Sequence, residues 1–208
     1  MESALRDGAC EPGLRLIETL GWTGQDLPRL HLHLARLAAS ASRLGWPCDT
    51  GAAGRALREA ASTASARVRL TLDATGRIEI QTAPVPPAKS EWTLTLATHR
   101  LSSADPWLTL KSSRRAAYDA ARAALPADVD EAIFLNERDE VCDGTITTLF
   151  FDRGQGLRTP PLASGLLPGV LRAELAAPEE VLLARDLPRV RLWVGNSLRG
   201  LIPARWRD

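Results

Sequence analysis

The feature that most constrains the fold of this 208-residue chain is a single long amphipathic segment, residues 29–44. Its apolar residues recur at three- and four-residue spacing, which places them on one stripe of a helix that Gly45 and Pro47 end. The polar residues His33, Arg36, Ser40 and Arg43 share the neighbouring face, and periodicity alone favours a solvated surface for them. The apolar stripe consists of Leu30, Leu34, Leu37, Ala38, Ala41 and Leu44.

Strand patterns surround this helix, so the first half of the chain predicts an α+β layer in the order β-α-α-β-β-β. Residues 67–72 alternate polar and apolar, turn at 73–76 and return over 77–81, which is typical of a hairpin. Further strands are expected at 14–22 and 92–97, and a second helix, capped by Asp49 or Thr50, is expected to run to about residue 64. Residues 84–87 are a proline-rich connector.

A break near residues 102–106 predicts two domains, a small N-terminal α+β domain (1–102) and a larger C-terminal domain (103–208). In the second, an apolar run at 107–110 indicates a buried strand that ends at Lys111, and a helix follows to about residue 125. Proline favours the first helical position, so another helix is expected to start at Pro168. Strands are expected at 131–136, 141–144, 147–151 and 191–194, with a turn at 195–200.

Composition excludes several classes of protein. The net charge is +1 and the arginines are scattered, so neither nucleic acid nor an anionic membrane is an expected partner. No apolar run is long enough to span a membrane, and the N-terminus lacks a signal-peptide core. Cys10, Cys48 and Cys142 show no metal-ligand spacing, so no metal site is expected and free thiols in a reducing, cytoplasmic setting are the default.

Lysine is rare in this sequence, because Lys89 and Lys111 are the only two. Lys89 follows the proline-rich connector and reads as exposed. Lys111 follows an apolar run, where partial desolvation favours the neutral amine that a Schiff-base lysine requires. From position alone, a lysine that ends a strand and reaches out to water is the more common interpretation.

Other residues could complete a site for pyridoxal phosphate, which needs a lysine, an acid opposite its ring nitrogen and an anion site. Asp143 could supply the acid, and the helix start at 168–171, including Val170 and Leu171, could supply backbone N–H groups. Arg36 could add a bidentate grip on the phosphate. Each feature also has an ordinary interpretation: Asp143-Gly144 as a hairpin turn, the Leu-Pro-Gly sequence as a plain helix start, and residues 195–197 as a tight turn.

The order of these motifs resembles the fold-type-IV pyridoxal-phosphate enzymes, the class IV aminotransferase family, and within it the aminodeoxychorismate lyases. The resemblance implies two α+β domains like those of D-amino acid aminotransferase, with the cofactor in the cleft between them. The matching motifs are residues 16–19, 33–37, 111–115, 118–119, 130–132, 135–137, 143–150, 159–162, 167–172 and 195–200.

The resemblance also implies roles for individual residues. Lys111 matches the catalytic lysine that carries the cofactor, and Arg36 matches the arginine that holds its phosphate. Val170 and Leu171 match the phosphate-binding helix start, and Asn196 and Ser197 match the turn that completes that site. Asp143 stands where the family usually has glutamate, so its carboxylate must approach the ring nitrogen by a backbone shift or through water; Thr148 replaces a common asparagine.

The activity implied is conversion of the small molecule 4-amino-4-deoxychorismate to 4-aminobenzoate and pyruvate, a step of folate biosynthesis. The alternatives are an aminotransferase acting on branched-chain or D-amino acids, and a non-catalytic relative that binds the cofactor or docks on a synthase. The family is usually homodimeric, and an aminodeoxychorismate synthase is a possible partner. Arg114, Arg115 and Arg199 are candidates for holding substrate carboxylates, with surface positions as the alternative.

Overall fold

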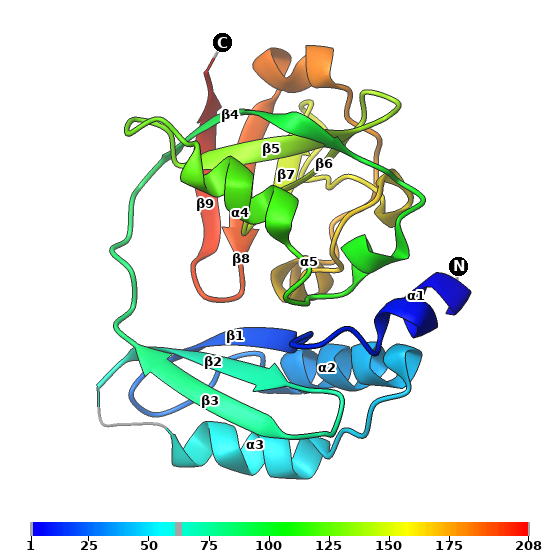
Figure 1. Cartoon of the computed structure of the whole chain (residues 1–208). Coiled ribbons are helices and arrows are strands. Elements are labelled where there is room, and N and C mark those ends of the chain that lie inside the picture. The colour runs from blue at the N-terminus through cyan, green and yellow to red at the C-terminus, as the bar shows by residue number, and fades with distance from the viewer. Residues whose placement is uncertain (1, 61–63, 208) are drawn as a thin grey trace. The chain divides into compact units, whose positions relative to one another are not determined.

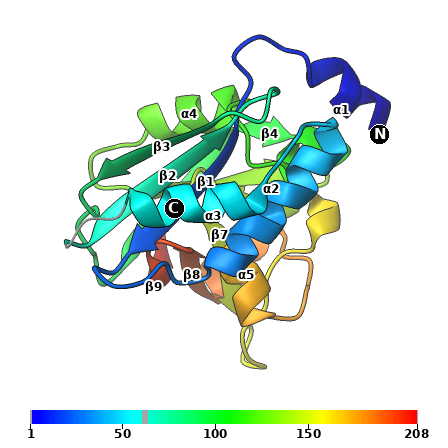
Figure 2. The ribbon, with the colours of Figure 1, turned by 90° about the horizontal axis from the view of Figure 1, so that it is seen from below.

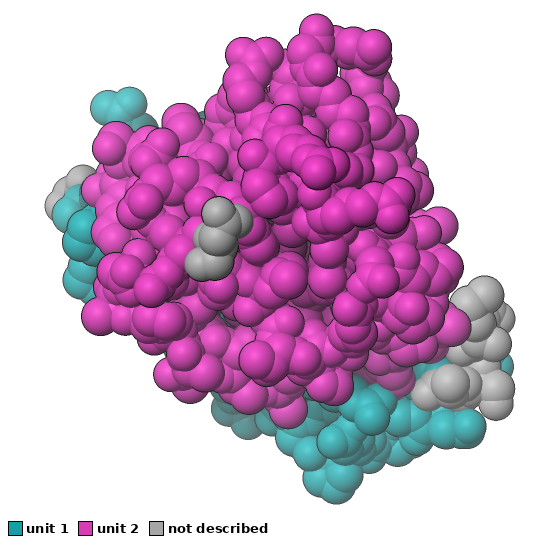
Figure 3. Space-filling view, turned by 90° about the horizontal axis from the view of Figure 1, so that it is seen from above, with its two compact units in different colours: residues 1–87, 110–114 teal, residues 88–109, 115–208 magenta. Residues whose placement is uncertain are grey.

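The computed structural model describes residues 2–60 and 64–207, which divide into two compact units (Figures 1 and 3). Unit 1 comprises residues 1–87 and 110–114, and unit 2 comprises residues 88–109 and 115–208. The chain therefore passes from unit 1 to unit 2 after Pro87, and it returns to unit 1 for five residues around Lys111.

Unit 1 is an antiparallel three-stranded sheet in the order β1-β2-β3, with helices α2 and α3 across one face (Figure 2). The first five elements of the expected β-α-α-β-β-β order form unit 1, the sixth, residues 92–101, lies in unit 2, and a short N-terminal helix, α1, precedes them. The elements are α1 (Glu2–Gly8), β1 (Leu16–Trp22), α2 (Leu30–Leu44), α3 (Thr50–Glu59), β2 (Ala66–Leu72) and β3 (Ile78–Ala83).

The ends of the two long helices follow from local chemistry. Gly45 ends α2 in the left-handed conformation, with φ 71°, which glycine adopts without steric cost. Asp49 begins α3, because its side chain accepts a hydrogen bond of 2.9 Å from the backbone N–H of Ala52. Helix α3 ends at Glu59, short of the expected residue 64, and residues 61–63 lie outside the described part of the chain.

The segment that carries Lys111 adds a further edge to the sheet of unit 1. Leu16 pairs with Ser112 in an antiparallel bridge, and the N–H of Ile17 donates to the carbonyl oxygen of Lys111 at 2.8 Å. The N–H of Ser113 donates in turn to the carbonyl of Arg15 at 2.8 Å. Lys111 thus opens an extended segment.

The expected strand over 107–110, ending at Lys111, is wrong. Pro106–Thr109 instead form a short 3₁₀ helix, η1. Asp105 starts it, because its carboxylate accepts the N–H of Trp107 at 2.9 Å, and proline at the first position has the φ that a helical turn requires. An apolar run of four residues cannot distinguish a strand from a buried turn by periodicity.

Unit 2 is built on a six-stranded mixed sheet in the order β6-β5-β4-β9-β8-β7. Strand β4 pairs in parallel with β5 and β9, and the other neighbours are antiparallel. The elements are β4 (Trp92–Leu101), α4 (Ala116–Ala123), β5 (Glu131–Asn136), β6 (Val141–Gly144), β7 (Thr148–Asp152), η2 (Leu162–Ser164), α5 (Val170–Leu175), η3 (Ala184–Arg189), β8 (Arg191–Asn196) and β9 (Gly200–Trp206).

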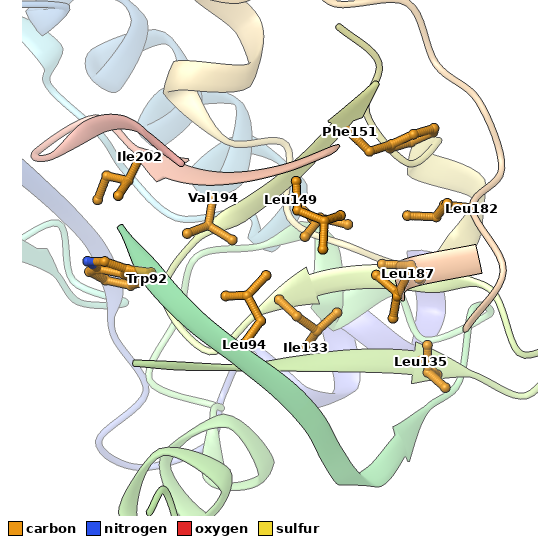
Figure 4. Packing of buried hydrophobic residues seen from close by; sticks show 12 residues of the cluster. Trp92, Leu94, Ile133, Leu135, Leu149, Phe151, Leu182, Leu187, Val194 and Ile202 are labelled. Carbon is orange, nitrogen blue, oxygen red and sulfur yellow. The ribbon is translucent and has the colours of Figure 1, made fainter. Parts of the chain in front are cut away.

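The sheet curls so that its first and last strands meet. A three-residue loop, 145–147, joins β6 to β7, and the N–H of Gly144 donates to the carbonyl of Thr147 at 2.8 Å. Apolar side chains from all the long strands fill the interior, as Figure 4 shows. This main core includes Trp92, Leu94, Ile133, Leu135, Leu149, Phe151, Val194 and Ile202. A second cluster, around Phe134, lies under α4.

Strand β4 places the division between the units earlier than the expected boundary at residue 102. Strand β4 lies between β5 and β9, and its residues Trp92 and Leu94 belong to the core of unit 2. Strand β9 is absent from the sequence-based expectation, since Pro203 is unusual within a strand.

Two helices of unit 2 differ from the expected ones. Helix α4 begins at Ala116 and ends at Ala123, so it is shorter than expected, and α5 begins at Val170 rather than Pro168. Within the described residues, no helix is both long and apolar enough to cross a membrane.

The core of unit 2 can be tested on one strand. Leu94 is 0% exposed and Leu96, two residues further along β4, is 39% exposed. We expect Leu94→Ala to lower the free energy of unfolding by about 2–5 kcal/mol, because it leaves a cavity in the main core. Leu96→Ala should change it by less than about 1 kcal/mol. Urea denaturation followed by tryptophan fluorescence measures both, and equal losses would contradict the assignment of this core.

Candidate active site

The predicted site residues are divided between the two units, and each set has its own surroundings. Lys111 and Arg36 belong to unit 1. The remaining five belong to unit 2: Asp143, Val170, Leu171, Asn196 and Ser197.

In unit 1, Arg36 is held by a buried carboxylate to which the sequence assigned no role. Glu18, on β1, is only 2% exposed. Its Oε1 accepts from Nε of Arg36 at 2.9 Å, and its Oε2 accepts from Nη2 of Arg36 and from Nδ1 of His33, each at 2.6 Å. His33 and Ser40 are also buried, so the expectation of a solvated polar face on α2 is wrong for them. This face packs on β1 because Glu18 supplies its acceptor.

The charges of this cluster follow from its burial. Desolvation alone would raise the pKa of the Glu18 carboxyl, but the charge of Arg36 and the hydrogen bonds from Arg36 and His33 outweigh it, so the pKa is lowered. Burial lowers the pKa of His33 despite the hydrogen bond to Glu18, and the positive charges of Arg36 and Lys111 act in the same direction. His33 is therefore neutral at pH 7, and we assign its proton to Nδ1, which donates to the carboxylate.

Lys111 is tied to the same strand as Glu18. Its carbonyl oxygen accepts the N–H of Ile17, the residue that precedes Glu18 on β1. The lysine is half-buried, and its charge is close enough to act on His33. Strand β1 therefore fixes the backbone of the lysine and the side chain of Arg36 at consecutive positions.

In unit 2, Asp143 lies on a β-bulge. Ile133 pairs with Gly144 and Leu135 pairs with Val141, so one residue of β5 faces two residues of β6, Cys142 and Asp143. Bulges re-aim a side chain and are common beside active sites. The carboxylate of Asp143, 6% exposed, accepts from the N–H of Leu167 at 3.2 Å and from the hydroxyl of Tyr118 at 3.4 Å.

The loop after Asp143 is organised by Glu131, another buried carboxylate that the sequence did not identify. Glu131 accepts from the N–H groups of Thr145 and Ile146, at 3.0 and 3.2 Å, and from the hydroxyl of Thr147 at 2.8 Å. The hydroxyl of Thr145 also donates to it. A single acid at the start of an otherwise apolar strand was the available signal, because a buried carboxylate requires donors.

The start of α5 packs directly on β7 and β8. Gly169 is its N-cap, and a Cβ there would lie 2.6 Å from Oγ1 of Thr148. A Cβ on Gly195 would lie 2.6 Å from both the Leu171 side chain and the carbonyl oxygen of Gly200. The two glycines therefore permit an approach that any side chain would block. The structure thus brings the first turn of α5 together with the end of β8.

Asn196 builds the turn that follows β8. Its Oδ1 accepts the N–H groups of Leu198 and Arg199, at 3.1 and 3.0 Å, and its Nδ2 donates to the carbonyl of Ile146 at 3.1 Å. The side chain is thus engaged in shaping the turn that carries Ser197 and in fixing this turn to the loop before β7.

The three arginines considered for substrate carboxylates all have protein neighbours within their own unit. Arg115 donates to Asp119 at 2.7 Å and to the carbonyl of Thr145 at 3.0 Å. Arg114 forms an exposed ion pair of 3.2 Å with Glu11. The Arg199 guanidinium lies 5.2 Å from the centre of the Trp92 ring. Arg115 therefore has a structural role in the loop beside Asp143.

Each unit contains groups of the kinds that pyridoxal phosphate requires. Unit 1 has a lysine on an ordered backbone and an arginine oriented by a buried acid. Unit 2 has a buried aspartate and a helix start whose N-cap is a glycine. An amine, an acid and anion-binding groups are what this cofactor needs from a protein.

Comparison with known proteins gives one consistent family. The profile of the family described as amino-transferase class IV matches residues 15–205. A Schizosaccharomyces pombe protein provisionally named aminodeoxychorismate lyase is 34% identical over 168 residues, which are 77% of this chain and 72% of that protein.

Solved structures similar to this chain are consistent with the same family. A Mesorhizobium loti protein provisionally described as an amino-acid aminotransferase is 43% identical, with a TM-score of 0.89 over 93% of this chain and 100% of that one. The 4-amino-4-deoxychorismate lyase of Pseudomonas aeruginosa is 24% identical, with a TM-score of 0.83 over 93% of this chain and 83% of that one, and this likeness shows the fold alone.

The burial of His33 predicts how the stability of the folded protein depends on pH. Because its pKa is lowered in the folded protein, the unfolded chain binds the proton more tightly and protonation favours unfolding. His33 thus penalises the folded state only as the pH falls below the ordinary histidine value of 6.5. Between pH 7.5 and 5.5 we expect stability to fall with a slope that approaches, and does not exceed, about 1.4 kcal/mol per pH unit from this group.

His33→Asn retains a donor for Glu18 but cannot titrate, so the loss of stability in this pH range should become shallower. His31→Asn is the matched control, since His31 lies on the same helix and is exposed. Urea unfolding at several pH values measures the slopes. A slope in His33→Asn as steep as that of the wild type would show that another group causes the acid sensitivity.

Proposed function

This chain belongs to the class IV aminotransferase family, and from that premise we propose that it is a lyase that converts 4-amino-4-deoxychorismate to 4-aminobenzoate and pyruvate. The expected α+β fold and the expected family are both confirmed by the match over residues 15–205 and by the related structures. The enzymes of this family depend on pyridoxal phosphate, so the chain is a pyridoxal-phosphate enzyme.

The observation that carries the lyase proposal is the S. pombe relative, whose provisional name is aminodeoxychorismate lyase and which is 34% identical over most of both chains. The motifs at 167–172 and 195–200, which most resemble lyase sequences, support the same choice.

In the proposed reaction, the cofactor and Lys111 have distinct roles. Pyridoxal phosphate, when bound, supplies an aldehyde that condenses with amines and a ring that withdraws electrons. Lys111 would hold the cofactor and then take the proton from the substrate carbon that bears the nitrogen. Loss of that proton lets the bond between the substrate ring and the ether oxygen break. Enolpyruvate leaves and takes up a proton to become pyruvate, and the substrate ring becomes aromatic.

The other residues bind and orient. Asp143 would keep a proton at the ring nitrogen, since a buried carboxylate favours a cationic neighbour. Arg36 and the N–H groups of Val170 and Leu171 would bind the phosphate, and the turn at Asn196 and Ser197 would border it.

An aminotransferase is the second candidate, and the 43%-identical M. loti protein favours it, since it is described as an amino-acid aminotransferase. Branched-chain and D-amino acids are the substrate classes we consider. In this reaction Lys111 would return the proton to the cofactor and a keto acid would be needed to complete the cycle. The early proton transfer is common to both, so Lys111 and Asp143 do not distinguish them.

The test compares the two lysines of the chain. We expect the wild type to release pyruvate from 4-amino-4-deoxychorismate without any keto-acid acceptor. Lys111→Ala should lose about 10²–10⁴-fold of that rate, together with the absorbance band of bound cofactor. Lys89→Ala should retain both, because Lys89 is exposed and pairs with Asp130 at 2.6 Å on the surface.

Coupled measurement of pyruvate with lactate dehydrogenase gives the rate. Amino transfer that needs 2-oxoglutarate, with no pyruvate from 4-amino-4-deoxychorismate, would replace the lyase by the aminotransferase. A Lys111→Ala protein as active as the wild type would remove both.

A further inference from the structure

We infer that Glu18 and His33 are positioning residues that fix the guanidinium of Arg36 for the phosphate of the cofactor. The inference rests on the proposed function, because it takes Arg36 as a phosphate-binding residue. It adds two residues to which neither the sequence motifs nor the resemblance gave a role.

The hydrogen bonds leave the guanidinium little choice of orientation. Nε and Nη2 of Arg36 both face Glu18, at 2.9 and 2.6 Å from its two oxygens. Such a paired contact fixes the plane of the guanidinium as well as its position.

The acid is itself held by its surroundings. Glu18 lies in the middle of β1, where it pairs with Leu70 of β2. His33 donates to Oε2 at 2.6 Å, so one face of α2 supplies all three donors, from positions three residues apart. Because Arg36 is ordered before any ligand arrives, binding need not supply the entropy of ordering its long side chain.

Two possible roles of Glu18 predict opposite effects of Glu18→Gln on phosphate binding. One role is to reduce the positive charge near the phosphate, and the other is to position Arg36. The carboxylate cancels the charge of Arg36, and His33 is neutral, so the cluster has no net charge. If Glu18 only reduced the attraction for phosphate, Glu18→Gln would tighten phosphate binding. If Glu18 positions Arg36, Glu18→Gln would weaken it, because an amide N–H₂ would meet the donors of Arg36 and His33.

The experiment measures the dissociation constants of pyridoxal phosphate and of pyridoxal, which lacks the phosphate, for the 208-residue protein stripped of cofactor. Absorbance titration gives both values. For the wild type we expect a clear preference for the phosphorylated compound. For Glu18→Gln we expect pyridoxal phosphate to bind about ten- to thirtyfold more weakly, with the pyridoxal constant unchanged.

Arg36→Ala should lose the same preference, and adding Glu18→Gln to it should cost nothing more, because the acid acts through the arginine. His33→Leu removes one donor and should weaken phosphate binding by a smaller factor, which His33→Asn should restore. These His33 variants carry the test if Glu18→Gln fails to fold. Glu79→Gln is the matched control, since Glu79 lies on the same sheet in an exposed ion pair with Arg77.

Tighter or unchanged binding of pyridoxal phosphate by Glu18→Gln would overturn the inference. Equal weakening for both compounds would also overturn it, because that is the result of a merely structural role. A wild type without preference for the phosphate would remove the proposed cofactor site as well. A wild type with the preference, beside variants that keep it, would remove the positioning role alone.

Discussion

The buried carboxylate of Glu18 is the interaction on which the arrangement of unit 1 depends. A carboxylate in the apolar interior is costly unless donors surround it, and breaking such a pair by removing one partner is strongly destabilising. Here His33 and Arg36 of α2 provide three donors, so the carboxylate restricts the rotation of that helix on the sheet. The same strand carries the backbone of Lys111. Strand β1 thereby contacts both a catalytic candidate, through its backbone, and an anion-binding candidate, through Glu18.

In unit 2, a buried carboxylate surrounded by donors likewise organises a loop. Glu131 organises residues 145–147 through backbone and hydroxyl donors, and this loop begins two residues after Asp143. Asp143 is displaced by a bulge and meets the N–H of Leu167, just before the start of α5. A bulge changes the direction in which a side chain points. Hydrogen bonds to buried carboxylates therefore determine the conformation of the segments that hold the predicted site residues.

Family membership narrows the chemistry without selecting the reaction. Lyase and aminotransferase share the lysine, the acid and the phosphate site, and their reactions diverge only after the first proton transfer. That divergence depends on the shape of the substrate pocket and on access for a second substrate. The relatives divide in the same way, since the S. pombe protein is named for one activity and the M. loti protein for the other.

The sequence by itself determined the elements whose patterns are local: the amphipathic helix that ends at Gly45, the hairpin at 73–76, the strand at 131–136 and the motifs that resemble the family. Tertiary structure decided whatever depends on distant partners. Periodicity could not show that Glu18 would bury the polar face of α2, because the acceptor lies on another element. Nor could it place β9 beside β4, identify the 3₁₀ helix before Lys111 or locate the bulge at Asp143. Helical and strand periodicity report which face of an element is apolar, whereas pairing, register and the burial of charge depend on which groups the fold brings into contact.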